Sequence, residues 1–443
     1  MVVGVLFGVL AICLLLTVPI AVSLGIATIA AGFSLNAVTG NQMLTMLAQT
    51  TITASDNTSL LAMPFFMLCG SLMDRSGIAK RLIDVAEAIV GEATGGLGAT
   101  TIVAAMLFAA ISGSGPACVA ALGGILIPAM VRRGYSTEYA AATTASAGTI
   151  GPVIPPSIPM IVYAVSAGTS VTALFLGGVG PGILMGLIMV FYNFLISKKR
   201  GYKGTPRGGG FLWVLKQVWK GLPALLMPVI VLGGIYSGLA TPTESAVLGV
   251  IYTLIVGFFV FRTLNFKLLK EALVEAAMMS APVMFLLGGA AVFGRLLTLQ
   301  RIPELLATAM LGLSDSKYVV MLLIMAFLLV AGMFIDTTSN IVLFAPLFCP
   351  IAQKLGLDLV YFGILMVVNL CIGFPDAAAW RQPVRRKEYI RRTIGRFGQR
   401  TDAIHRHPRS GARPDGLLPA DRHVPAKSGR WMTPDTQELL TVA

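Results

Sequence analysis

The sequence predicts an all-α, polytopic membrane protein whose membrane part consists of two repeats. Its 443 residues are 56% hydrophobic and only 12% charged, and the mean hydropathy of +0.82 is far above that of soluble domains. Long apolar stretches succeed one another along most of the chain. Two of them are interrupted by polar residues, and features that follow each interruption recur with a constant offset, which indicates an internal duplication.

The first apolar stretch, 2 to 33, contains no charged residue and is long enough to cross a hydrocarbon core, which needs about 20 apolar residues. A cleaved signal peptide is a poor interpretation, because the stretch is too long and no basic residues precede it. An amphipathic segment, 80 to 89, is expected to lie along the membrane interface. Further apolar stretches occur near 60–73, 98–131, 139–167, 172–197, 222–236, 243–261, 277–294, 319–353 and 359–374.

Two of these stretches are too interrupted to be simple membrane spans. Residues 98 to 131 are broken at 112 to 116 (SGSGP), and residues 319 to 353 are broken at 336 to 340 (DTTSN). Each predicts two half-length helices around a polar tip. Such a re-entrant hairpin is tolerated only where it is buried in protein or lines a water-filled space.

The two hairpins keep the same register relative to the segments on their C-terminal side. Pro128 precedes Ile150-Gly151, and Pro350 precedes Ile372-Gly373, so that both features repeat with an offset of 222 residues. Repeated halves with paired broken helices are how many secondary transporters form a binding site at the membrane midplane. The alternative is that glycine and serine at these positions only permit close helix packing.

Charge is distributed unevenly between the membrane part and the tail. Residues 1 to 374 carry 19 basic and 13 acidic side chains, whereas residues 375 to 443 carry 14 and 7. The membrane part therefore has an ordinary positive-inside excess and needs no nucleic-acid partner. The basic loop 198 to 207 is placed in the cytoplasm, as is a second loop with Arg262, Lys267 and Lys270, which leaves two spans between them.

Histidine and cysteine chemistry is not expected in the membrane part. The three histidines, His405, His407 and His423, all lie in the tail. The five cysteines lie in apolar segments and lack metal-ligand or CxxC spacing. There is also no phosphate-binding GxxxxGK[ST] motif. We therefore expect no enzyme, no organic cofactor and no ATPase.

Residues 148 to 160 (GTIGPVIPPSIPM) contain four prolines in an apolar segment, so a continuous helix cannot pass through them. Together with other motifs in order, this segment resembles the large permease subunit of tripartite ATP-independent periplasmic (TRAP) transporters. The resemblance covers residues 1 to 374. The other motifs are 63–70 (MPFFMLCG), 108–115 (FAAISGSG), 127–135 (IPAMVRRGY), 238–245 (GLATPTES) and 332–338 (GMFIDTT).

The resemblance implies an elevator-type transporter of the bacterial inner membrane with two inverted repeats. It further implies coupling to Na⁺ and import of a small organic anion, with C4-dicarboxylates as the expected class. The implied partners are a small four-helix membrane subunit, a periplasmic substrate-binding protein and membrane lipid. The alternatives are a stand-alone sodium/anion symporter, a non-transporting remnant, or an interaction protein whose basic tail binds anionic lipid.

The resemblance also implies the site residues. Freed carbonyls and hydroxyls suit a hard cation and bury no net negative charge, although a helix kink is the alternative role of these residues. Asp336 either completes a functional site at membrane depth or caps a helix. The sodium ligands are expected among Ser112, Ser114, Gly151, Ile154, Pro156 and Asp336, and the hairpin-tip residues that meet substrate among Gly113, Gly115, Thr337 and Thr338.

Three other charged residues are weaker candidates for a site. Glu244 comes directly after Thr-Pro-Thr at a predicted helix start, so capping is favoured over substrate contact. Arg295 and Arg301 could meet an anion, but arginines at the edge of an apolar run more often extend to the membrane interface.

The sequence divides into four segments: a first repeat, 1–197; a basic cytoplasmic loop with an interfacial segment, 198–221; an incomplete second repeat, 222–374; and a basic tail, 375–443. At the last boundary the composition changes abruptly from apolar to rich in arginine. Read one base out of frame, residues 375 to 382 are compatible with a Pro-Pro pair at positions 377 and 378, which equal Pro155 and Pro156 plus 222. We therefore expect a frameshifted tail rather than a genuine cytoplasmic one, and no transport by the chain as written.

Overall fold

The computed structural model describes residues 2–34, 40–205, 209–313 and 316–381, all of which lie in the unit Met1–Ile394. Every regular element in these ranges is helical, and six helices are long and apolar enough to cross a membrane. The tail beyond residue 381, including the three histidines, lies outside the described residues.

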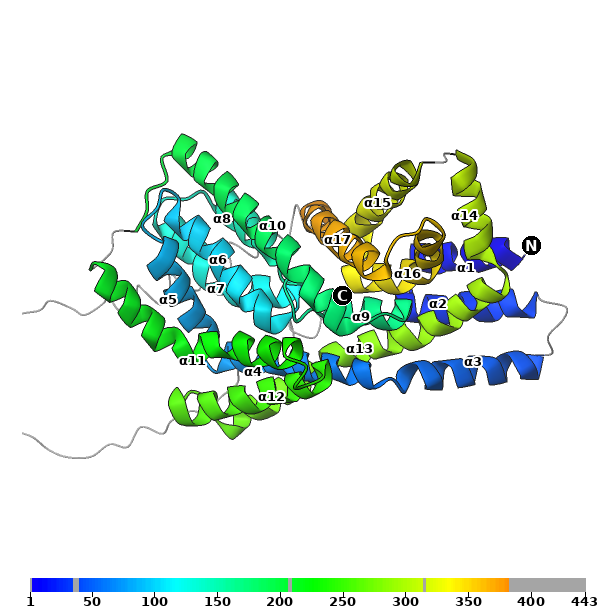
Figure 1. Ribbon diagram of the computed structural model, residues 1–443, viewed down its shortest axis with the longest axis horizontal. Helices are drawn as coiled ribbons and strands as arrows, with labels where there is room; N and C mark the ends of the chain where they lie inside the picture. Colours follow the sequence, from blue (N-terminus) through cyan, green and yellow to red (C-terminus); the bar gives the residue numbers. More distant parts are fainter. Residues whose placement is uncertain (1, 35–39, 206–208, 314–315, 382–443) are drawn as a thin grey trace, which may run out of the picture. The chain divides into compact units, whose positions relative to one another are not determined.

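Ten α-helices form the described first half of the chain (Figure 1). Most of them begin or end where proline, glycine or a capping side chain interrupts the apolar pattern. They are α1 (Val2–Leu15), α2 (Ile20–Phe33), α3 (Gly40–Ser55), α4 (Ala62–Arg75), α5 (Ile78–Val90), α6 (Gly96–Ser112), α7 (Gly115–Arg132), α8 (Thr137–Gly148), α9 (Ile158–Ala167) and α10 (Val171–Arg200).

Seven α-helices form the described second half, and they carry the apolar stretches predicted there. They are α11 (Phe211–Tyr236), α12 (Pro242–Ile255), α13 (Phe266–Leu299), α14 (Ile302–Leu313), α15 (Lys317–Phe334), α16 (Thr337–Lys354) and α17 (Leu359–Arg381). A π-helical turn, Val256–Val260, extends α12. The long helices expose apolar side chains outward; on α10, for example, Leu176 and Phe191 are 62% and 63% exposed.

The apolar stretch 2 to 33 is not one element. It forms α1 and α2, because the chain turns at Thr17, whose φ is +59°, and Pro19 precedes α2 as its N-cap residue. Helices α3 and α14 were also not anticipated. The amphipathic segment 80 to 89 does form a helix, α5, which buries one face including Leu82 and Ala86.

Both predicted re-entrant hairpins are present. Helices α6 and α7 meet at residues 113 and 114, and α15 and α16 meet at residues 335 and 336. The first hairpin packs on α8, and the second packs on α17 (Figure 1). The prolines that close them, Pro128 and Pro350, lie inside α7 and α16.

The offset of 222 residues extends over the described fold. It relates the first residues of α2 and α12 (Ile20 and Pro242), those of α8 and α17 (Thr137 and Leu359), and the last residues of α7 and α16. The glycines between the latter helices and the next, Gly134 and Gly356, also correspond, and both have positive φ. Two repeats therefore account for the architecture, and their inversion is what the resemblance implies, whereas the boundaries of the four predicted segments remain predictions.

The repeats differ after the hairpins. In the first, the chain leaves helical geometry between Gly148 and Ile158, as the four prolines predicted. In the second, α17 continues to Arg381, and positions 377 and 378 are alanines instead of prolines. The Pro-Pro break therefore has no counterpart in this sequence.

The end of α10 lies beside the base of the first hairpin. The Gly95 N–H donates to the carbonyl of Tyr202, and the Ser136 N–H donates to the Tyr202 hydroxyl at 3.2 Å, which lowers the pKa of that phenol. Because α10 has 30 residues and a rise of about 1.5 Å per residue, its two ends lie at opposite membrane faces. The basic end beside Tyr202 is the end that the positive-inside rule predicts to be cytoplasmic.

The two repeats interlock through α9, which packs on α16 and α17 of the other half. The Tyr163 hydroxyl donates to the Leu359 carbonyl at 2.8 Å, and the Tyr163 ring covers Gly363. Tyr163 is fully buried, so this contact belongs to the core of the fold rather than to its surface.

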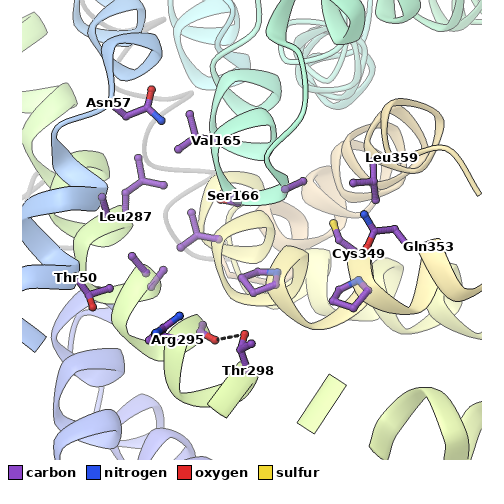
Figure 2. Close-up of a pocket in the computed structure, with 18 residues that line it drawn as sticks. Thr50, Asn57, Val165, Ser166, Leu287, Arg295, Thr298, Cys349, Gln353 and Leu359 are labelled. Atoms are coloured by element: carbon purple, nitrogen blue, oxygen red, sulfur yellow. Dashed lines mark hydrogen bonds between the residues drawn. The ribbon is translucent and has the colours of Figure 1, made fainter. Parts of the chain in front are cut away.

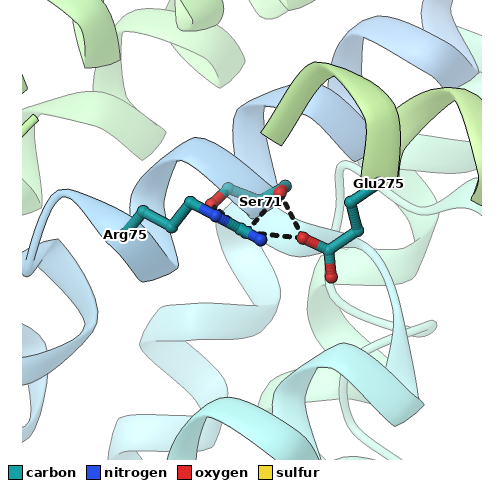
Figure 3. A network of polar contacts seen from close by, with 3 residues as sticks. All are labelled: Ser71, Arg75 and Glu275. Carbon is teal, nitrogen blue, oxygen red and sulfur yellow. Dashed lines mark hydrogen bonds and ion pairs between the residues drawn. The ribbon is translucent and has the colours of Figure 1, made fainter. Parts of the chain in front are cut away.

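A polar link joins α4 to α13 (Figure 3). The Ser71 hydroxyl donates to Glu275 Oε2 at 2.7 Å, and Arg75 forms an ion pair with the same oxygen. Arg75 Nη1 also donates to the Ser71 hydroxyl at 2.8 Å. The three side chains therefore act as one another's hydrogen-bond and ion-pair partners, and they link two helices that belong to different repeats.

Candidate functional site

The tip of the first hairpin is bonded to the broken segment that comes after α8. Gly113 ends α6 with φ +60°, a conformation that a side chain disfavours. The carbonyl of Gly113 accepts the N–H of Ile158 at 3.3 Å, and Ser114 begins α7 as its N-cap residue. The hairpin tip therefore lies against the start of α9.

Glycine permits this close approach on both sides. A Cβ on Gly113 would collide with the carbonyl oxygen of Pro156. A Cβ on Gly151 would lie 2.9 Å from the carbonyl oxygen of Ser114 and 3.1 Å from the Cα of Gly115. The structure thus brings together Gly113, Ser114 and Gly115 of the tip with Gly151 and Pro156 of the break, and their role as ion or substrate ligands remains a prediction.

Several oxygen atoms at this junction lack hydrogen-bond donors. Within the described residues, the carbonyls of Gly151, Ile154 and Pro156 accept no hydrogen bond, and the buried Ser112 hydroxyl has no partner. By contrast, the carbonyl of Pro152 accepts the Ser157 hydroxyl. Buried polar groups without partners are costly, so the junction presents oxygens that a ligand could satisfy.

The junction contains no charged side chain among residues 112–115 and 149–157. Carbonyl and hydroxyl oxygens without a net charge suit a hard monovalent cation, and they suit a transition metal poorly. The described residues contain no cluster of three or more histidine, cysteine or acidic side chains that could hold a metal ion.

The tip of the second hairpin is organised differently. Asp336 is exposed and caps α16, because its carboxylate accepts the Ser339 N–H at 2.9 Å. This is the alternative role of Asp336, and its role as an ion ligand remains a prediction. Thr337 is buried and Thr338 is partly buried at the first turn of α16.

Asn340 is a buried polar residue that the sequence did not single out. Its side chain is fully buried, and Nδ2 donates to the carbonyls of Ala331 at 3.3 Å and Ile335 at 2.8 Å. Oδ1 has no partner among the described residues. The residue lies in the polar break DTTSN, but only the folded hairpin brings the two carbonyls within its reach.

Glu244 has the structural role that was favoured for it. Its carboxylate accepts the Thr241 N–H at 2.8 Å, and the Thr241 hydroxyl accepts the Glu244 N–H at 3.3 Å, so the two residues form a capping box at the start of α12.

Arg295 lines a cavity of about 490 Å³ between α3, α9, α13 and α16 (Figure 2). Arg295 and Thr298 approach it from α13, and Cys349 and Gln353 from α16. Asn57 and Ser166 complete its polar lining with Thr50. Arg301 is exposed and does not line this cavity.

Comparison with known proteins identifies the architecture. Residues 7–375 match the family model described as the tripartite ATP-independent periplasmic transporter, DctM component. The chain belongs to the DctM family of TRAP transporters. It is accordingly a multi-pass protein of the inner membrane and a transporter subunit rather than an enzyme.

Three named relatives are 38% to 45% identical to this DctM protein over the residues that align. An isethionate TRAP transporter permease protein, DctMQ, from Oleidesulfovibrio alaskensis is 45% identical over 84% of this chain and 58% of the relative, so the match spans little more than half of that protein. The C4-dicarboxylate large permease of Pseudomonas aeruginosa is 43% identical over 72% and 74% of the two chains. The sialic acid large permease SiaM of Vibrio cholerae is 38% identical over 76% and 78%.

A solved structure shares the fold of this DctM protein. The Alcanivorax borkumensis YdaH transporter, whose topology is described as unusual, superposes with a TM-score of 0.54 at 17% identity and covers 80% of this chain and 82% of its own. This likeness extends to the fold alone.

Proposed function

We propose that this protein is the large membrane subunit of a sodium-coupled importer of small organic anions. The observation that carries the proposal is the junction of the first hairpin, where the buried Ser112 hydroxyl and the carbonyls of Gly151, Ile154 and Pro156 lack donors within the described chain. A sodium ion satisfies such oxygens without a carboxylate, because carbonyl dipoles can replace part of its hydration shell.

The substrate class comes from the named relatives, which are permeases for isethionate, C4-dicarboxylates and sialic acid. All three ligands are small organic anions. A C4-dicarboxylate is the substrate we propose for this chain. A small four-helix membrane subunit and a periplasmic binding protein that delivers the anion are its proposed partners.

We further propose that the chain as written does not complete the transport cycle. In the second repeat, alanines occupy positions 377 and 378, where the offset of 222 residues places the counterparts of Pro155 and Pro156. Without a proline break there, Gly373 and Asp376, the counterparts of Gly151 and Ile154, lie inside α17, where helical hydrogen bonds occupy carbonyls that would serve a second ion.

Sodium binding at the first hairpin can be tested on the full chain in lipid nanodiscs. The unfolding midpoint is measured in NaCl and in choline chloride at equal ionic strength. A sodium concentration tenfold above the dissociation constant should stabilise the protein by about 1.4 kcal/mol, so the midpoint should be higher in NaCl. Ser112→Ala should remove most of this difference.

Ser245→Ala is the matched control. Ser245 is a buried serine whose hydroxyl also lacks a partner in the described structure, but it lies in α12, so its variant should keep the full sodium response. Equal midpoints of the unmodified protein in the two salts, or an unchanged response in Ser112→Ala, would contradict the proposed site.

A further inference from the structure

The cavity beside Arg295 has the size and polarity of a small-ligand site. Its volume of about 490 Å³ lies within the range of roughly 300 to 1,000 Å³ that is typical of such sites. Arg295 is the one charged residue among the described residues that line it. No ion pair of Arg295 occurs in the described chain.

Within the described residues, no acidic side chain lines the cavity with Arg295. Asp56 and Asp358 are adjacent in sequence to the lining residues Asn57 and Leu359, but neither lines the cavity. The Asp358 carboxylate accepts the Tyr361 N–H at 3.0 Å. We therefore expect a positive field inside the cavity, which weak screening by the protein walls would strengthen.

Two uncharged amides supplement the guanidinium. Asn57 Oδ1 accepts the Ser59 N–H at 2.9 Å, which leaves the Asn57 Nδ2 group as the free donor of that side chain. Gln353 is exposed on the α16 wall and can also donate. Figure 2 shows both amides with Arg295 around the same space. Thr298 is not a comparable donor, because its hydroxyl already donates to the Gly294 carbonyl at 2.9 Å.

The cavity lies at the membrane face opposite the basic loop. Val165, Ser166 and Ala167 line it at the end of α9, a few residues before α10 begins. Helix α10 then crosses to Arg200 at the cytoplasmic face. The cavity therefore faces the periplasmic side, from which an imported anion arrives.

We propose that this cavity is a receiving site for the imported anion, in which the Arg295 guanidinium binds one carboxylate of a small dicarboxylate and the amides of Asn57 and Gln353 donate to it. A planar guanidinium binds a carboxylate through two parallel hydrogen bonds, which a flexible ammonium cannot reproduce. The assignment rests on the proposed import of organic anions, and it adds the residue that recognises the charge.

The charge of the cavity can be measured without transport. Thr298→Cys in a Cys349→Ala background places a thiol on its wall. The labelling rates of an anionic methanethiosulfonate (the ethylsulfonate) and a cationic one (the ethyltrimethylammonium) are then compared in nanodiscs, after each rate is divided by the rate of the same reagent with free 2-mercaptoethanol. The anionic reagent should react faster, and Arg295→Gln should lower the ratio of the two rates about 5-fold, because one nearby charge is removed.

Arg301→Gln is the matched control, since it removes an equal charge six positions away along the sequence and outside the cavity. It should leave the rate ratio unchanged. Ser166→Cys supplies a second reporter on the opposite wall and should show the same dependence on Arg295. Equal rates for the two reagents at both reporters would refute the positive cavity.

The ligand is tested with succinate as the probe. Millimolar succinate should slow labelling at Thr298→Cys when Arg295 is present and should have no effect in Arg295→Gln. Protection that persists without Arg295, or no protection, would overturn the assignment. Labelling is also measured without succinate in nanodiscs that contain anionic lipid and in nanodiscs of zwitterionic lipid only. Slower labelling in the anionic nanodiscs, with no effect of succinate, would assign the cavity to a lipid headgroup instead. Because none of these readouts requires sodium or uptake, failure here is separate from failure of the proposed function.

Discussion

The N–H of Ile158 donates to the carbonyl of Gly113 at 3.3 Å, which joins the tip of a re-entrant hairpin to the first residue of the helix beyond the proline-rich break. The two segments are 45 positions apart in sequence. This bond and the absence of side chains at Gly113 and Gly151 fix the spacing of the carbonyls between them. Any group that enlarges either segment should therefore disturb the proposed ion site.

Gly113→Ala is expected to destabilise the protein strongly. Positive φ should cost about 1 kcal/mol for alanine, and the collision of Cβ with the Pro156 carbonyl should add roughly 1 to 3 kcal/mol. Gly134→Ala is the control, because Gly134 has φ +84° but open space around its Cβ position. The unfolding midpoints of the two variants are measured in nanodiscs, and their difference gives the cost of the collision with Pro156 beyond the cost of positive φ. Equal decreases of the midpoint in both variants would show that the collision is unimportant.

Asn340→Leu should loosen the second hairpin. It removes two hydrogen bonds to the carbonyls of Ala331 and Ile335, each worth about 1 kcal/mol, although the Ala331 carbonyl still accepts the Ile335 N–H. Asn369→Leu removes one comparable bond, from Asn369 Nδ2 to the Met325 carbonyl. We expect the loss of unfolding free energy to be about twice as large for Asn340→Leu as for Asn369→Leu. A smaller loss in Asn340→Leu than in Asn369→Leu would show that the two hydrogen bonds of Asn340 do not stabilise the hairpin.

Glu275→Gln should weaken the link between α4 and α13. The glutamate is partly exposed, with 43% of its side chain accessible, so we expect a loss of only about 1 kcal/mol. Raising the salt concentration should narrow the difference from the unmodified protein. Glu271→Gln, one turn earlier on α13 and without an ion pair in the described residues, should unfold like the unmodified protein. The ion pair would be irrelevant if both variants behaved alike.

Resequencing of codons 365 to 385 tests the proposed frameshift. We expect one extra or missing base, whose correction places Pro-Pro at positions 377 and 378. The corrected chain, expressed with its small subunit and binding protein, should take up a labelled C4-dicarboxylate in the presence of sodium, whereas the present chain should not. Robust sodium-dependent uptake by the present chain would remove the basis for calling it incomplete.

Local sequence signals predicted the hairpins, the proline break and the Glu244 cap. Each of these depends on residues within a few positions, such as Pro155 and Pro156 or Thr241 and Glu244, whose backbone effects act locally. The division of residues 2 to 33 into two helices was not apparent, because the apolar run continues through the turn at Thr17. Helix α3 was not predicted because polar residues are interspersed among its apolar ones, so that residues 40 to 55 do not form a continuous apolar stretch.

Features created by distant segments could not be read from the sequence. Asn340 donates to the carbonyls of Ala331 and Ile335 only when α15 and α16 pack against each other. Arg295 lines a cavity only because α3 and α16 approach α13. The alternation of apolar and polar residues specifies which faces are buried, but it does not specify which distant side chains meet. The capping role of Asp336 was within reach, because the residue directly precedes a helix.

The contact of Tyr163 with Leu359 and Gly363 means that neither repeat can complete its own core. Separate production of the two halves should leave α9 without the surface that buries it, so each half should be degraded unless both are synthesised together. Duplication of a helical unit has here produced a single cooperative body. A change that removes α9 or the part of α17 that it contacts should therefore lower the stability of both halves together.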